Sequence, residues 1–143
     1  MRQNFIIHKL ARYTVSLMLV VNASILHAED ISKTNTILCA SVSAVACLSD
    51  GDCISAVPWE LNIPNFIKID LQEKLLSTTE ASGERRETVI SNLRKDDGLI
   101  FLQGIEAGRA FSFVIDEDTG MATLAVARRE LTVTVFGSCT PIQ

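Results

Sequence analysis

The stretch of sequence that decides the fold is TILCASVSAVACLSDGDC, residues 36–53. Residues 36–47 read as one strand, which ends where an Asp-Gly pair begins. Asp-Gly is a strong turn dipeptide, so the chain is expected to reverse direction at residues 49–51. Cys47 and Cys53 would then face each other across a hairpin.

The sequence has four cysteines, Cys39, Cys47, Cys53 and Cys139, which suit two disulfides in an oxidising compartment. On one strand, Cys39 and Cys47 would lie roughly 26 Å apart at ~3.3 Å per residue. A disulfide needs Cα atoms within about 7 Å. Cys39 is again too far from Cys53 across the hairpin. The predicted pairs are therefore Cys47–Cys53 and Cys39–Cys139.

The Asp-Gly-Asp motif of residues 50–52 also raises the question of a metal loop. An EF-hand needs alternating oxygen ligands, a glycine at the sixth position and a glutamate at the twelfth, and only the two aspartates fit. A structural zinc site uses Cys-x2-Cys pairs or histidines, and residues 29–143 contain neither. A Cys-x2-Cys redox motif is also absent. The motif is predicted to be a turn held by a disulfide, without metal or cofactor.

Short alternating apolar runs follow the hairpin and are separated by turns rich in acidic residues and glycine. These runs predict strands at residues 66–71, 88–94, 99–103, 109–115, 121–127 and 131–136. Only residues 70–77 could form a helical turn or two. The period-two pattern predicts an all-β antiparallel meander of seven or eight strands. A small closed barrel is expected, because a Cys39–Cys139 bridge places the first and last strands side by side; a two-sheet sandwich is the alternative.

Residues 1–28 resemble a secretory signal, with a positively charged start and a short apolar core at residues 13–21. Cleavage is expected after Ala28, with Ala23 as the alternative. The apolar core is well short of the ~20 residues that span a bilayer, so no stable membrane insertion is expected once the signal is removed. The sequence predicts a periplasmic or secreted protein with one β-barrel-like domain at residues 29–143.

Removal of the signal would change the charge and the available chemistry. All 17 acidic residues lie after residue 28, whereas three of the 13 basic residues lie before it, so the net charge moves from −4 to −7. An acidic surface disfavours nucleic acid and favours basic partners. Both histidines, His8 and His27, belong to the signal. Without histidine, the usual Ser-His and Cys-His pairs cannot form, so no enzymatic activity is predicted.

The acidic group at residues 116–118 is the densest in the chain and could in principle supply a glycosidase carboxylate pair. It lies beside Gly120 in a predicted turn, where acidic residues are common turn formers. A structural role is therefore predicted for it. Arg109 follows Glu106 across another turn, and a surface ion pair of little energy is expected there.

Two segments supply candidate binding residues. Trp59, the only tryptophan, lies between Pro58 and Pro64 in a segment that the prolines are expected to keep extended. It either caps one end of the barrel or offers an apolar contact. Residues 80–87 form a polar loop that is either a simple hairpin connection or a contact surface. The predicted binding residues are Trp59, Ser82, Gly83, Arg85 and Arg86.

Two family resemblances add to these expectations. The cysteine layout, the segment WELNIPNFIKIDL at residues 59–71 and the closing FGSCTP resemble a group of small exported proteobacterial proteins, which implies a bacterial exported protein. Residues 81–85, ASGER, resemble the Ser-Gly loop of proteinaceous inhibitors of c-type lysozyme, with Ser82 and Gly83 at the matching positions. Arg85 and Arg86 stand where those inhibitors have an aromatic residue. This second resemblance implies a disulfide-containing barrel and an inhibitory contact.

The sequence therefore predicts an exported, non-enzymatic binding or interaction module. Its partner is expected to be another protein or a small apolar ligand, and not nucleic acid. Two alternatives stay open. One is an inhibitor of a lysozyme-like or proteolytic enzyme that uses the loop at residues 80–87, and the other is a carrier of a small lipophilic ligand in an open barrel.

Overall fold

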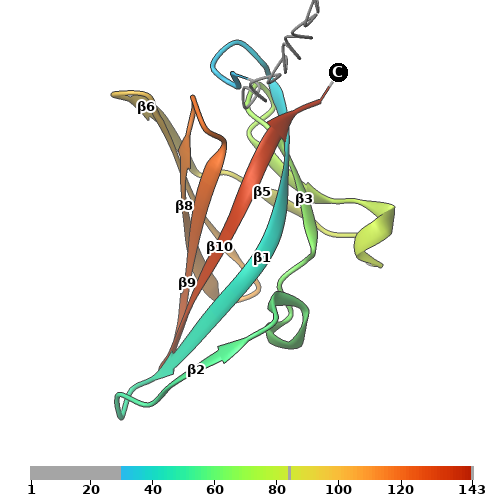
Figure 1. Ribbon diagram of the computed structural model, residues 1–143. Coiled ribbons are helices and arrows are strands. Elements are labelled where there is room, and N and C mark those ends of the chain that lie inside the picture. The colour runs from blue at the N-terminus through green and yellow to red at the C-terminus, as the bar shows by residue number, and fades with distance from the viewer. Residues whose placement is uncertain (1–29, 84, 143) are drawn as a thin grey trace, which may run out of the picture.

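A computed structural model describes residues 30–83 and 85–142, so the predicted signal at residues 1–28 lies outside the described residues. The described chain forms ten strands and two short 3-10 helices (Figure 1). The strands are β1 (Thr36–Leu48), β2 (Cys53–Ala56), β3 (Phe66–Asp70), β4 (Leu75–Thr78), β5 (Glu87–Val89), β6 (Asn92–Asp96), β7 (Leu99–Glu106), β8 (Arg109–Asp116), β9 (Met121–Arg128) and β10 (Leu131–Pro141). The helices are η1 (Pro58–Leu61) and η2 (Glu80–Ser82). Across the described part of the chain, no helix has the length and apolar character that a membrane span requires.

The strands form one antiparallel sheet in the order β5-β4-β3-β1-β10-β9-β8-β7-β6, which curls into a half-barrel. β1 and β10 are the central pair of this sheet, and β10 pairs along one edge of β1. On the other edge, β1 pairs first with β3 and then, beyond a bulge near Ser41, with β2. Figure 1 shows the β1–β2 hairpin extending past the rest of the sheet. The predicted all-β, antiparallel and disulfide-stapled fold is confirmed.

The two edge strands of this sheet, β5 and β6, follow each other directly in the chain. Residues 88–94, predicted as one strand, divide into β5 and β6 because their two halves pair with different neighbours, β4 and β7. Between them, the Ile90 N–H donates to Lys74 O at 2.8 Å and the Ser91 N–H to Gln103 O at 2.8 Å. A Cβ on Gly104 of β7 would lie 2.9 Å from Val89 O, so this glycine allows β5 to come close to β7.

The predicted helical turns at residues 70–77 are wrong. One Asp70 carboxylate oxygen accepts the N–H groups of Gln72 and Glu73, at 3.0 and 2.8 Å, and this Asx turn reverses the chain. Lys74 completes the turn in a left-handed conformation with φ 53°. Leu76 of β4 then packs into the core beside β3. Burial of Leu76 and the local aspartate turn together favour a strand over a helix.

The core is built from the inward residues of the alternating runs. Ile37, Ile69, Ile100, Leu102 and Ile115 are completely or almost completely buried. Ile31, which precedes β1, is also fully buried, and its N–H donates to Glu117 O at 3.1 Å. Ile31 therefore packs against the end of the half-barrel formed by the β8–β9 turn.

Both predicted disulfides are present. Cys39 and Cys139 are opposite each other on β1 and β10, with Cα atoms 3.9 Å apart, and both are buried. Cys47 and Cys53 are opposite each other in the β1–β2 hairpin, with Cα atoms 4.1 Å apart, and Cys53 is exposed. One disulfide thus joins the two central strands, and the other holds a projecting hairpin.

Candidate functional site

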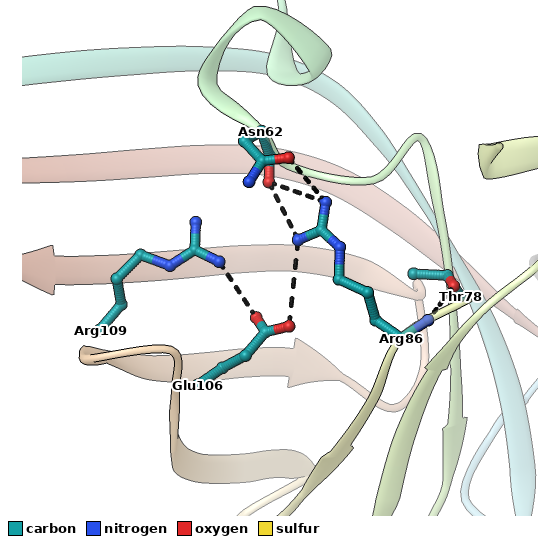
Figure 2. Close-up of polar contacts among 5 residues, drawn as sticks. All are labelled: Asn62, Thr78, Arg86, Glu106 and Arg109. Carbon is teal, nitrogen blue, oxygen red and sulfur yellow. Dashed lines mark hydrogen bonds and ion pairs between the residues drawn. The ribbon is translucent and has the colours of Figure 1, made fainter. Parts of the chain in front are cut away.

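Four polar residues gather at one end of the half-barrel and form what we call the mouth cluster: Asn62, Arg86, Glu106 and Arg109 (Figure 2). Glu106 ends β7 and Arg109 begins β8, and both continue the inward-facing series of their strands. Arg86 directly precedes β5, and Asn62 follows η1. The inward positions that are apolar deeper in the sheet are thus occupied at its end by two guanidinium groups and a carboxylate.

The cluster is held together by charge-assisted contacts. Arg109 Nη2 donates to Glu106 Oε2 at 3.4 Å, and Arg86 Nη1 lies 3.9 Å from Glu106 Oε1. The side chains are only 17% exposed for Arg109, 21% for Arg86 and 31% for Glu106. The predicted Glu106–Arg109 pair is therefore present, but it is half-buried and belongs to a network, rather than being an isolated pair on open surface.

Asn62 links this network to η1. The Asn62 backbone is left-handed, with a φ of 59°, a conformation that asparagine tolerates better than most residues. The Asn62 N–H donates to Trp59 O at 3.1 Å. Arg86 Nη2 donates to Asn62 Oδ1 at 2.8 Å, and the Asn62 carbonyl also accepts from Arg86 Nη1 and Nη2 at 3.3 and 3.4 Å. These bonds fix the Arg86 guanidinium between η1 and Glu106.

Two concave spaces adjoin the cluster. An inner apolar cavity of about 60 Å³ lies beneath it, among side chains that include Ile67, Phe111, Phe113 and Leu124. This is well below the ~150 Å³ of a cavity that holds benzene. A cleft of about 280 Å³ lies beside it, next to η1 and the ends of β9 and β10. Asn62, Ile63, Arg109 and Val126 line both spaces.

Arg109 keeps donor capacity that the protein does not use. Within residues 30–83 and 85–142, its only hydrogen bond is the one from Nη2 to Glu106. No buried side-chain nitrogen or oxygen in that part of the chain lacks a partner, so Nε and Nη1 of Arg109 are reached by solvent. Figure 2 shows the outer nitrogen of Arg109 pointing away from Glu106. These atoms can donate to a bound molecule.

The predicted binding residues separate into different places. Trp59 lies on η1 beside the cleft and is 63% exposed, so its side chain does not fill the end of the half-barrel. The expectation that the prolines keep this segment extended is wrong. Pro58 is the first residue of η1, where its missing N–H costs no helical hydrogen bond.

The loop at residues 80–87 contains η2 and projects to one side of the sheet (Figure 1). Ser82 Oγ donates to Phe66 O at 2.9 Å and accepts the Phe66 N–H at 3.0 Å, so its hydroxyl anchors the loop to β3. Gly83 ends η2 in the left-handed conformation. Arg85 is almost fully exposed, 3.8 Å from Glu80. Of the predicted loop residues, Arg86 alone joins the mouth cluster.

Arg128, at the end of β9, also lines the cleft. Sequence reasoning missed Asn62 and Arg128 as site residues and treated Glu106 and Arg109 as a surface pair. A usable signal was present in the strand pattern. Glu106 continues the inward series of Ile100 and Leu102, and Arg109 begins that of Phe111 and Phe113. Charged residues at inward positions of two neighbouring strands indicate a polar layer at one end of the sheet.

The acidic turn at residues 116–118 has a structural role, as predicted. Asp116 Oδ1 accepts from the Thr119 N–H at 2.7 Å, from Thr119 Oγ1 at 2.8 Å and from the Asp118 N–H at 3.1 Å. These bonds, mainly those from Thr119, favour the ionised carboxylate and hold the pKa of Asp116 below its ordinary value. Glu117 of this turn forms an ion pair with Lys95 of β6 at 2.7 Å. The turn lies at the other end of β7 and β8 from Glu106 and Arg109.

This lowered pKa makes the turn sensitive to acid. Because the pKa is lower in the folded state, the Asp116 carboxylate stabilises the fold above its unfolded pKa of about 3.9, and this stabilisation is lost as the pH falls through the folded pKa. We expect Asp116→Asn to lower the urea midpoint at pH 7 and to reduce its decrease between about pH 5 and pH 2. Asp118→Asn is the control, and an equal acid response in both variants would contradict the assignment.

Comparison of this chain with protein-family models, curated proteins and solved structures found no match. Its functional interpretation therefore rests on the geometry of the curled, disulfide-stapled half-barrel and of its mouth. The resemblances to exported proteobacterial proteins and to lysozyme inhibitors stay predictions.

Proposed function

We propose that this chain is an extracytoplasmic, non-enzymatic binding protein that binds its ligand at the mouth of the half-barrel. The observation that carries the proposal is the Arg109 guanidinium. It is a half-buried cation with solvent-reached nitrogens beside a cleft, and Glu106, its one side-chain partner in the described part of the chain, is shared with Arg86. A partly desolvated charge is costly unless it is compensated, and a bound anion would provide that compensation.

The extracytoplasmic placement is supported by the cysteines. All four are paired, and the described residues include no free thiol. Stable structural disulfides are typical of exported proteins. The signal-like features of residues 1–28 point in the same direction.

Native mass spectrometry of the protein purified from its own host tests the proposed function. We expect a reproducible added mass that is retained by Arg129→Met and lost by Arg109→Met. Arg129 is an exposed cation in the turn between β9 and β10 and does not line the cleft, so it controls for loss of charge alone. Folded protein without any added mass, or an added mass that both variants keep, would contradict a binding site at the mouth.

Inhibition of an enzyme is the second candidate function, and the anchored loop favours it. The two hydrogen bonds between Ser82 and Phe66 hold the loop in place, and a pre-ordered loop loses little entropy on binding. Arg85 is an almost fully exposed cation of this loop. If an excess of the protein leaves a panel of lysozymes and periplasmic proteases fully active, this candidate is excluded.

The inner cavity does not support a lipophilic carrier. At about 60 Å³ it is smaller than a benzene-sized site, because inward side chains such as Phe111 and Phe113 fill the half-barrel. Any ligand of useful size would occupy the outer cleft, where Arg109 supplies a charge.

A further inference from the structure

We infer that the outer cleft is a site for a small monocarboxylate with a short apolar tail, with the carboxylate at Arg109 and the tail on the apolar floor. This inference rests on the proposed function and specifies its ligand.

The charges on the cleft favour one negative charge. Among residues 30–83 and 85–142, Arg109 and Arg128 line it together with a single acid, Glu60. Arg128 occupies the inward series of β9 after Leu124 and Val126, so both cations belong to strand ends that face the same space. Arginine is the usual partner of carboxylates because its planar donors match their two oxygens. The excess of one cation suits a monoanion better than a dianion such as phosphate.

Glu106 does not oppose such a ligand. One of its oxygens faces Arg86 and the other faces Arg109, so its charge is engaged on both sides. Arg86 is in turn held by Asn62. The mouth cluster therefore works as a support that fixes the Arg109 side chain at its Nη2 and leaves the outer nitrogen, Nη1, for the ligand. A positioned donor binds with a smaller loss of side-chain entropy than a mobile one.

Apart from Asn62, the remaining lining residues are apolar and suit the rest of the ligand. Ile63, Val126, Leu131 and Val133 contribute side chains from the segment after η1, from β9 and from β10. The cleft of about 280 Å³ is roughly twice the volume of a cavity that holds benzene. The space therefore fits a ligand of about ten non-hydrogen atoms. Burial of a short tail against these residues would add affinity in proportion to its area.

Titration of the disulfide-intact protein with hexanoate, followed by two-dimensional NMR, tests the inference. We expect saturable shifts at residues that line the cleft, and binding roughly tenfold weaker or more for hexanamide, which lacks the charge. Acetate, which lacks the tail, should also bind roughly tenfold more weakly or worse. Arg109→Met should weaken hexanoate binding by roughly tenfold. Arg129→Met should leave it within about twofold.

A second variant tests the cleft independently, in case Arg109→Met does not fold. Leu131→Trp should fill the cleft without changing the Glu106–Arg109 pair, and it should abolish hexanoate binding while the melting temperature is retained. Equal binding of hexanoate and hexanamide, or hexanoate binding that survives both substitutions, overturns the inference. If hexanoate does not bind but protein from the host carries an Arg109-dependent mass, this ligand class is wrong and the proposed function stands. If neither is observed, both fail.

Discussion

Replacing Cys39 and Cys139 together by alanine should lower the free energy of unfolding by about 4–5 kcal/mol, the largest effect that we expect from any pair of substitutions. The bridge spans 100 residues and joins the two central strands, so its loss frees the unfolded chain from a very long closed loop. Alanine is preferred to serine because both sulfurs are buried and no hydroxyl should be placed there. Urea unfolding at neutral pH measures the change. The expected loss is comparable with the whole free energy of unfolding of a typical domain, ~5–15 kcal/mol.

The second disulfide supplies the matched control. Cys47 and Cys53 are separated by only 6 residues and lie in the projecting hairpin. Replacing this pair by alanine should cost about 2 kcal/mol in the same chain-entropy model. Equal losses for the two double variants, or a larger loss for the hairpin pair, would show that loop length does not govern the stabilisation.

Gly120→Ala should lower the free energy of unfolding by about 3 kcal/mol or more, for two reasons that act together. Gly120 has a φ of 69°, where a residue with a Cβ is strained. A Cβ at this position would also collide with the carbonyl oxygen of Cys139, while the Cys139 N–H donates to Gly120 O at 2.7 Å. The substitution would therefore push the end of β10 away from the β8–β9 turn.

Gly108→Ala separates the two causes. Gly108 has a φ of 75°, similar to that of Gly120, but a Cβ there would meet nothing within 4 Å. The free energy of unfolding should then fall only by the backbone strain, about 1–2 kcal/mol. Urea midpoints of the two variants, compared at constant m-value, give the steric contribution by difference. A Gly120→Ala protein as stable as Gly108→Ala would contradict the close approach to Cys139.

The parts of the fold that could be predicted are those in which local pattern and covalent geometry agree. Residues 36–53 contain a strand, a turn dipeptide and three cysteines, whose spacing allows only Cys47 and Cys53 to pair within the segment. The alternating runs likewise indicate which of their side chains are buried, as in the run that places Phe111, Phe113 and Ile115 on one face. Each of these inferences needs only neighbouring residues and the reach of a disulfide.

Other features depend on contacts that no local pattern records. β4 was not predicted, because a polar turn at residues 71–74 directly precedes this strand of only four residues. The division into β5 and β6 arises because one run of sequence pairs with two strands that are far apart along the chain. Arg86 was singled out from the loop at residues 80–87, but its partners Asn62 and Glu106 lie 24 and 20 positions away. The site is assembled by topology.

The adjacency of β1 and β10 has a consequence for how the protein reaches its folded state. The central pairing of the sheet joins the first of the described strands to the last of them, so it has a high contact order and cannot form until the residues of β10 have been synthesised. During that interval β1 has β2 and β3 as its nearest partners in the chain, while its other edge, the one that will receive β10, stays unpaired. An unpaired strand edge is a template for aggregation. Folding yield should therefore depend on what protects that edge in the nascent chain, and not on the stability of the finished sheet alone.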